Sequence, residues 1–194
     1  SRPHRSEIDV IFNGAMSDEA IAEISGISHI IAEKEFEGEL RQRHRSHAIA
    51  YTITPSHSGN GDVVANPAQA ELHETLARIF GSVQDCSRTL SSLRAVKQPH
   101  ELDSMQRAID LTVRAFKDVR DNLNALSSEN ELEAEFIYRF RRAGATHAYE
   151  PIVASGANAC TLHYIANDRK IGARDMVLID IGARVDGYAA DITR

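Results

Sequence analysis

The chain has 194 residues, of which 42% are hydrophobic and 26% charged, the balance of an ordinary soluble globular protein. Its formal net charge of −6 argues against nucleic acid and anionic membranes as partners. The two cysteines, Cys86 and Cys160, form no disulfide framework, and no apolar run resembles a signal peptide or a transmembrane segment, so we expect a reducing, cytoplasmic setting.

The first part of the chain alternates β-rich and helical segments. Strands are predicted at 9–12, 30–31 and 48–54, helices at 17–25, 36–43 and 66–80, and a turn-rich loop at 55–62. Ser17 can cap the first helix, because a serine hydroxyl accepts a hydrogen bond from a free N–H group of the first turn. Strands that alternate with helices indicate a small α/β domain, to which we assign residues 1–96.

A second domain, residues 97–194, is expected to open with two helices. The stretch from Leu93 to Pro99 forms the boundary. An apolar stripe predicts a long helix with its core face at Leu102, Met105, Ile109, Val113, Phe116, Leu123 and Leu126. Ser128 and Glu131 have capping-box spacing, and the helix that follows would bury Leu132, Phe136, Ile137 and Phe140 and end at Gly144.

Residues 180–194 predict a β-hairpin. The pair Asp186-Gly187 between alternating residues favours a two-residue type I′ turn, which needs positive φ at both central positions. With that turn, Ile181 faces Ile192, and the apolar side chains of both strands share one face of the hairpin.

Two carboxylates share the opposite face. Asp191 falls opposite Gly182, which leaves room beside it, and Asp180 is a diagonal neighbour about 7–8 Å away. Carboxylates that converge in this way repel each other unless a cation or proton intervenes, and hard oxygen ligands suit manganese, magnesium or calcium. Two alternatives remain open: the aspartates are solvated on an exposed sheet face, or a one-residue slip of register separates them.

The residues before the hairpin complete an ordered motif. The motif consists of Ser155, Gly156, Asn158, His163, Tyr164, Asp180, Gly182, Gly187, Tyr188, Asp191, Thr193 and Arg194. This order is similar to that of the pita-bread metallopeptidases, specifically the aminopeptidase P and Xaa-Pro dipeptidase family. The segment from Leu93 to Leu102 also resembles the linker that enters the catalytic domain of that family.

The resemblance implies a fold and a chemistry. The fold would be α/β (α+β), with a truncated creatinase-like N-terminal domain followed by the first half of a pita-bread domain. The activity would be hydrolysis of the N-terminal Xaa-Pro bond by a hydroxide that bridges two divalent ions, with manganese favoured over cobalt or zinc. Asp180 would bind one metal in a bidentate manner, Asp191 would bridge both, and His163 would act on the substrate as the catalytic residue.

The family site also requires a histidine and two glutamates from a second half-domain, which this sequence does not supply. We therefore expect no peptidase activity from this chain alone, which would need the missing catalytic half or a complementary chain. The expected substrate is a peptide with proline at its second position, and the expected assembly is a homo-oligomer. A prolidase and a non-catalytic pita-bread fragment that binds peptides or partners remain as alternatives.

Overall fold

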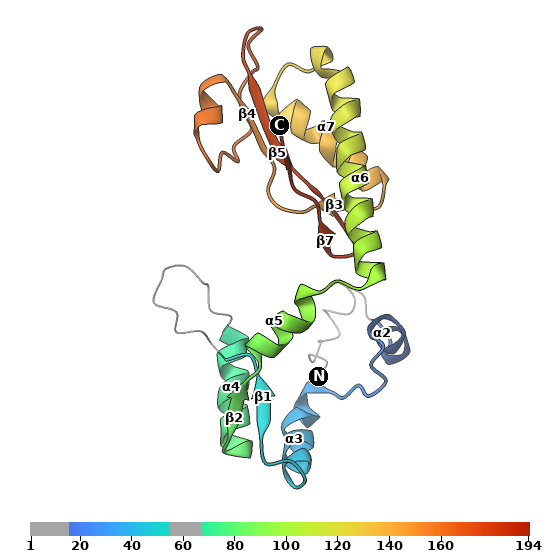
Figure 1. Ribbon diagram of the computed structural model, residues 1–194, viewed down its shortest axis with the longest axis vertical. Coiled ribbons are helices and arrows are strands. Elements are labelled where there is room, and N and C mark those ends of the chain that lie inside the picture. Colours follow the sequence, from blue (N-terminus) through green and yellow to red (C-terminus); the bar gives the residue numbers. More distant parts are fainter. Residues whose placement is uncertain (1–15, 55–66) are drawn as a thin grey trace. The chain divides into compact units, whose positions relative to one another are not determined.

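The computed structural model describes residues 16–54 and 67–194, with the helices and strands shown in Figure 1. The chain divides into two compact units, Ser1–Ala95 and Val96–Arg194. Both units combine helices with strands, so the mixed α/β (α+β) class is confirmed. The strand expected at 9–12 and the loop expected at 55–62 lie outside the described residues.

Helices accompany a two-stranded parallel sheet in the first unit. Its described elements are α2 (Asp18–Ser25), η1 (Glu33–Glu35), α3 (Phe36–His44), β1 (Ala50–Thr52), α4 (Pro67–Phe80), β2 (Val83–Asp85) and α5 (Ser87–Ala95). The three predicted helices and the strand within 48–54 are confirmed, and Ser17 Oγ caps α2 by accepting from the Ala20 N–H at 3.2 Å. The strand expected at 30–31 is wrong, because the chain turns into η1 directly after it.

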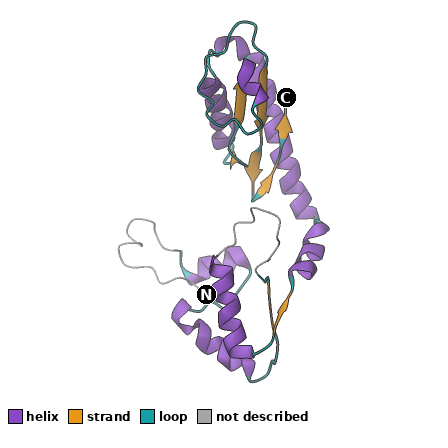
Figure 2. Ribbon diagram, turned by 90° about the vertical axis from the view of Figure 1, so that its left-hand side faces the viewer, coloured by secondary structure: helices purple, strands orange, loops and turns teal. Residues whose placement is uncertain are grey.

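Two long helices and a set of antiparallel strands form the second unit. Its elements are α6 (Pro99–Asp121), η2 (Leu123–Ala125), α7 (Glu129–Arg142), β3 (Thr146–His147), β4 (Ile152–Ser155), η3 (Gly156–Cys160), β5 (Val177–Ile181), β6 (Ala183–Val185), β7 (Tyr188–Ala189) and β8 (Ile192–Thr193). The strands form two sheets, in the orders β3-β6-β7 and β4-β5-β8. The strands are coloured orange in Figure 2. One hairpin therefore contributes to both sheets, β5 and β8 to one and β6 and β7 to the other.

Helix α6 buries small side chains where the sequence predicted larger ones. Its buried residues are Ser104, Ala108, Leu111, Thr112, Ala115 and Val119. Leu102 and Ile109 of the predicted stripe are 53% and 40% exposed, and Met105 is only partly buried. The small side chains let the helix approach the strands so closely that Thr112 Oγ1 accepts a hydrogen bond from the Ala183 N–H at 3.0 Å.

The amino end of α7 differs from the predicted capping box by one residue. The Glu131 carboxylate accepts a hydrogen bond from the Ser127 N–H at 2.6 Å, whereas the Ser128 hydroxyl caps nothing. The predicted carboxyl end is confirmed, because Gly144 takes a φ of +75°, a left-handed conformation that ends a helix and suits glycine.

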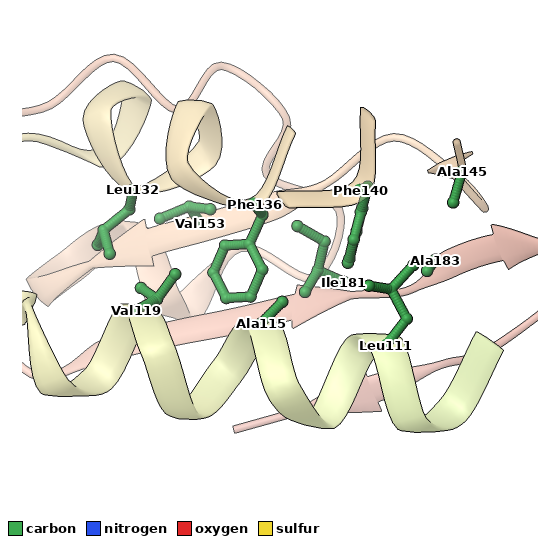
Figure 3. Close-up of a cluster of buried hydrophobic side chains, with 10 residues drawn as sticks. All are labelled: Leu111, Ala115, Val119, Leu132, Phe136, Phe140, Ala145, Val153, Ile181 and Ala183. Atoms are coloured by element: carbon green, nitrogen blue, oxygen red, sulfur yellow. The ribbon is translucent and has the colours of Figure 1, made fainter. Parts of the chain in front are cut away.

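The core of the second unit lies between α6, α7 and the strands. It consists of Leu111, Ala115, Val119, Leu132, Phe136, Phe140, Ala145, Val153, Ile181 and Ala183 (Figure 3). Phe136 meets Phe116 edge to face at 4.9 Å between ring centroids. Ile137, which was expected to join this core, is instead 38% exposed. Because Ile181 and Ala183 point into the core, their neighbours in the hairpin point to the opposite face of the sheet.

No helix in residues 16–54 or 67–194 combines the length and the apolar character that crossing a bilayer requires.

Candidate metal centre

The hairpin has the predicted turn and register. Asp186 and Gly187 have φ angles of +50° and +86°, both positive as a type I′ turn requires. Val185 pairs with Tyr188, and Ile181 pairs with Ile192, as the sequence predicted. The predicted apolar face is also confirmed, since Ile181, Ala183 and Ala190 are buried. The slipped register, which would have separated the two aspartates, is excluded.

Gly182 allows a close contact between the two strands, whereas the sequence predicted that it leaves open space between the carboxylates. A Cβ at this position would lie 1.7 Å from the carbonyl oxygen of Ala190, far inside contact distance. The space beside Gly182 is therefore filled by the backbone of the opposing strand and is not open between the carboxylates. The close approach occurs where the hairpin passes from one sheet to the other, directly beside Asp191.

Asp180 and Asp191 converge on the hydroxyl of Tyr149. The Tyr149 oxygen lies 2.6 Å from Asp180 Oδ1 and 2.9 Å from Asp191 Oδ1. Tyr149, which lies just before β4, was not among the predicted site residues. The antiparallel pairing of Ile152 with Asp180 brings the residues before β4 to this end of β5, and the spacing of the residues in the sequence does not indicate that pairing.

The phenol cannot satisfy both carboxylates at once. A tyrosine hydroxyl has one proton, so it donates to one oxygen while its own oxygen faces the other. Burial first, and then the hydrogen bonds to Asp180 and Asp191, raise the pKa of the Tyr149 phenol well above its usual range, so the proton stays on at neutral pH. The converging oxygens thus leave an excess of negative charge, which suits a hard cation.

The pair forms an incomplete cation site. Asp180 is partly buried and Asp191 is exposed. Within the described part of the chain, no group of three or more His, Cys, Asp or Glu side chains is placed to hold a metal ion. Two carboxylates supply hard ligands of the correct type but leave most of an octahedral shell to other groups.

His163 lies exposed in the turn that follows η3. Among the residues that the structure describes, no hydrogen bond or ion pair joins His163 to Asp180 or Asp191. The role of His163 as the catalytic residue therefore stays a prediction.

His147 packs inside the second unit. Its ring meets that of Phe140 at 5.1 Å, and its two ring nitrogens are buried without a hydrogen-bond partner. Burial lowers the pKa of His147, and the nearby charge of Glu133 partly opposes this effect. His147 therefore packs on Phe140 as a neutral imidazole and makes no hydrogen bond to Asp180 or Asp191.

Three other motif residues surround a buried carboxylate that was not among the predicted site residues. Glu129, the first residue of α7, is fully buried. Its Oε1 accepts hydrogen bonds from the Ser155 N–H at 2.6 Å, the Ser155 hydroxyl at 2.8 Å and the Asn158 amide at 3.2 Å. Its Oε2 accepts from the Tyr164 hydroxyl at 2.8 Å and the Arg169 N–H at 3.0 Å. Ser155, Asn158 and Tyr164 therefore bind a carboxylate of their own chain.

Comparison with known proteins identifies the second unit. A model of metallopeptidase family M24 matches residues 103–194, which include the whole hairpin and Tyr149. Residues 103–194 belong to metallopeptidase family M24. The name of the family denotes metal-dependent peptidases, and the hard oxygen ligands of the Asp180–Asp191 pair are of a type that binds metal ions.

Relatives and solved structures extend this match to nearly the whole chain. The Xaa-Pro aminopeptidase of Escherichia coli is 29% identical over 190 residues, which is 96% of this chain and 43% of the relative. The Xaa-Pro aminopeptidase of Haemophilus influenzae is 39% identical over 120 residues, which is 59% of this chain and 27% of the relative. The structure of E. coli aminopeptidase P superposes with a TM-score of 0.81 at 26% identity and covers 98% of this chain.

The M24 match is therefore a match to part of a larger protein. The chain spans 44% of the E. coli aminopeptidase P structure and 44% of the Pseudomonas aeruginosa aminopeptidase PepP structure, with which the TM-score is 0.80 at 26% identity over 99% of this chain. A zinc-substituted form of the E. coli enzyme, solved in complex with product, superposes with a TM-score of 0.79 at 25% identity over 98% of this chain and 44% of that chain. The pita-bread fold of aminopeptidase P is thus confirmed for this chain.

The buried Glu129, within the segment that matches family M24, makes the stability of this chain depend on pH. Burial alone would raise the pKa of Glu129, but hydrogen bonds from Arg169, Ser155 and Tyr164 overcome it and lower the pKa to about 2 from the usual 4.5. A depressed folded-state pKa contributes stability above the unfolded pKa, and that contribution is lost as the pH falls from about 4.5 to about 2.

We expect Glu129→Gln to lower the free energy of unfolding by about 1–3 kcal/mol at pH 7. Each Glu129 oxygen accepts from a backbone N–H, so the amide NH₂ of glutamine would face an N–H donor in either orientation. The difference between parent and variant should shrink below pH 4.5, because only the parent titrates. Urea unfolding from pH 7 to 3 measures it, with the exposed Glu150→Gln as a control that should change nothing. A difference that does not depend on pH would contradict this account.

Proposed function

We propose that this chain belongs to a metal-dependent aminopeptidase that hydrolyses the N-terminal Xaa-Pro bond of peptides. The observation that carries the proposal is the convergence of Asp180 and Asp191 on the Tyr149 hydroxyl, within a segment matched to family M24. The relatives named above are Xaa-Pro aminopeptidases, which favours this activity over that of a Xaa-Pro dipeptidase. A purely binding pita-bread protein would have no need of two unneutralised carboxylates at one point.

The side chains have distinct roles in this proposal. Asp180 and Asp191 hold two divalent ions, manganese in preference to cobalt or zinc, because both present hard anionic oxygens. Such ions would lower the pKa of water and polarise the scissile carbonyl. Tyr149 keeps the two carboxylates together through its hydroxyl, and His163 contacts the substrate.

The proposal includes further residues that complete the site. This chain supplies two of the metal ligands and spans less than half of its relatives, so the remaining ligands would come from another part of the protein. An apolar groove in the second unit offers a place for that part; it is lined by Phe116, Val119, Leu123, Val177 and Ile179 and by the cationic side chains of Lys117, Arg120 and Arg194. We propose that the second half of the catalytic domain covers this groove. Residues 1–96 would then be the N-terminal domain and residues 97–194 the first catalytic half. We also propose that the protein works as a cytoplasmic homo-oligomer.

Two measurements test the proposed function. The mass of the intact source protein should exceed that of this chain by about 100 or more residues, the size of a half-domain. The full-length protein with Mn²⁺ should release the first residue of the tripeptide Ala-Pro-Ala and leave Ala-Ala-Ala intact, and EDTA should abolish the activity. Equal hydrolysis of both peptides would exclude proline specificity, and activity that survives EDTA would exclude the metal mechanism.

A further inference from the structure

Several residues of the segment from Ser155 to Arg169 donate hydrogen bonds to one buried carboxylate, that of Glu129. Two of its residues, Ser155 and Arg169, donate backbone N–H groups to Glu129, and the side chains of Ser155, Asn158 and Tyr164 donate as well. No cation pairs with Glu129 among the described residues, so these neutral donors and the amino end of α7 compensate its charge. Buried charge held in this way fixes the position of every group that donates to it.

The second oxygen of Glu129, Oε2, binds the residue that follows His163 in the sequence. Tyr164, the next residue along the chain, donates its hydroxyl to Glu129 Oε2 at 2.8 Å. The backbone around His163 otherwise has little support, because Leu162 is 86% exposed and Ile165 is 56% exposed. The Tyr164 hydroxyl, which also lies 3.1 Å from Asp168 Oδ1, thus anchors the exposed turn that presents the imidazole, and its shorter contact is the one to the buried Glu129.

The opposite end of the segment is closed by a separate contact. The Arg169 guanidinium donates to the Ser155 carbonyl oxygen at 2.6 Å and pairs with Asp175 at 3.1 Å. A Cβ on Gly156, whose φ is +53°, would lie 2.4 Å from that guanidinium. The two ends of the segment are therefore held independently of Tyr164, so loss of the Tyr164 hydroxyl releases the His163 turn without releasing the whole segment.

We propose that Glu129 is a positioning residue for the peptidase reaction, which sets the location of His163 through its hydrogen bond with Tyr164. This inference rests on the proposed function, since it assumes that His163 contacts the substrate. Glu129 lies on α7, far in the sequence from His163. The proposal gives it a role in catalytic turnover in addition to its role in stability. The geometry of a catalytic group matters because a displacement of about 1 Å can cost about 100-fold in rate.

A double-mutant cycle in the full-length, Mn²⁺-loaded protein tests the proposal. Tyr164→Phe removes the hydroxyl that contacts the buried Glu129 and, at a longer distance, the exposed Asp168, and we expect it to lower kcat/KM for Ala-Pro-Ala about tenfold; Asp168→Asn, which leaves the Glu129 contact in place, should lower it less than about twofold. In the His163→Ala background Tyr164→Phe should lower kcat/KM less than about twofold, because the group that it displaces is then absent. Tyr138→Phe, an exposed tyrosine on α7, is the matched control and should leave kcat/KM unchanged in both backgrounds.

Amide hydrogen exchange gives a second readout that does not require activity. Tyr164→Phe should speed exchange in residues 161–166 and leave α6 and α7 unchanged, whereas Tyr138→Phe should alter neither region. Unchanged exchange in residues 161–166, or an equal loss of kcat/KM with and without His163, overturns the positioning role. An inactive parent protein overturns the proposed function and the assignment of His163 with it, and the exchange result, compared between Tyr164→Phe and Asp168→Asn, still decides whether the contact of Tyr164 with Glu129 holds the turn.

Discussion

Asp191→Asn in the full-length protein should weaken Mn²⁺ binding by more than about 100-fold and remove peptidase activity. The substitution keeps the shape of the side chain but replaces an anionic ligand with a neutral amide, which removes half of the converging charge at Tyr149. Even changes to groups that only support a metal ligand cost about 10–100-fold in affinity, so loss of a ligand itself should cost more. Calorimetric titration with Mn²⁺ measures the affinity, and hydrolysis of Ala-Pro-Ala measures the activity.

Asp186→Asn provides the matched control in the same hairpin. Asp186 occupies the turn at a φ of +50°, which asparagine also tolerates, and its carboxylate pairs with Arg107 at 2.8 Å on the protein surface. Loss of this exposed pair should cost at most about 1 kcal/mol of stability and should leave Mn²⁺ affinity unchanged. If Asp191→Asn binds Mn²⁺ as tightly as the parent, Asp191 is no metal ligand, and the solvated-carboxylate alternative holds.

The hairpin could be predicted from sequence because its determinants are local. Positive φ at Asp186 and Gly187 fixes the turn, and the turn fixes which residues pair along both strands. The shared face of Asp180 and Asp191 follows from that register without knowledge of any other element. The same reasoning explains the confirmed helix ends at Ser17 and Gly144, where one residue decides the local backbone.

The partners of these residues could not be predicted in the same way. Tyr149 meets Asp180 and Asp191 only because β4 pairs with β5, and nothing in the spacing of the three residues announces that pairing. Glu129 looks like an ordinary acidic residue in the first turn of a helix, a position that is usually exposed. Its burial depends on contact with Ser155, which is distant in the sequence and whose backbone N–H donates to the Glu129 carboxylate.

Helix α6 shows a different limit of sequence reasoning. Hydrophobic periodicity selected the large side chains, including Leu102 and Ile109, which the structure leaves exposed. The buried stripe contains Ala108 and Ala115, because close contact with the strands requires small residues more than apolar ones. Size complementarity depends on the partner surface, which the sequence of one helix does not contain.

Gly182→Ala should lower the free energy of unfolding by more than about 3 kcal/mol, the upper part of the range for overpacked sites. The added Cβ would lie 1.7 Å from the Ala190 carbonyl oxygen and 3.2 Å from the Asp191 backbone nitrogen. Backbone atoms cannot rotate away as a flexible side chain can, so the two strands must separate at the point where they carry the carboxylates. Urea unfolding measures the loss of stability. Mn²⁺ titration under conditions in which the variant is folded should show weaker binding than in the parent.

Gly144→Ala separates this steric effect from the general cost of replacing a glycine. Gly144 has a φ of +75° but open space around its Cα, so alanine there should cost only the left-handed strain of about 1–2 kcal/mol and leave Mn²⁺ affinity unchanged. If Gly182→Ala and Gly144→Ala lower the free energy of unfolding equally, the predicted clash with the Ala190 carbonyl oxygen adds nothing to the cost of Gly182→Ala. Gly182→Ala retains both Asp180 and Asp191. If it weakens Mn²⁺ binding and Gly144→Ala does not, the metal site depends on the close approach of the two strands at Gly182 as well as on the carboxylates themselves.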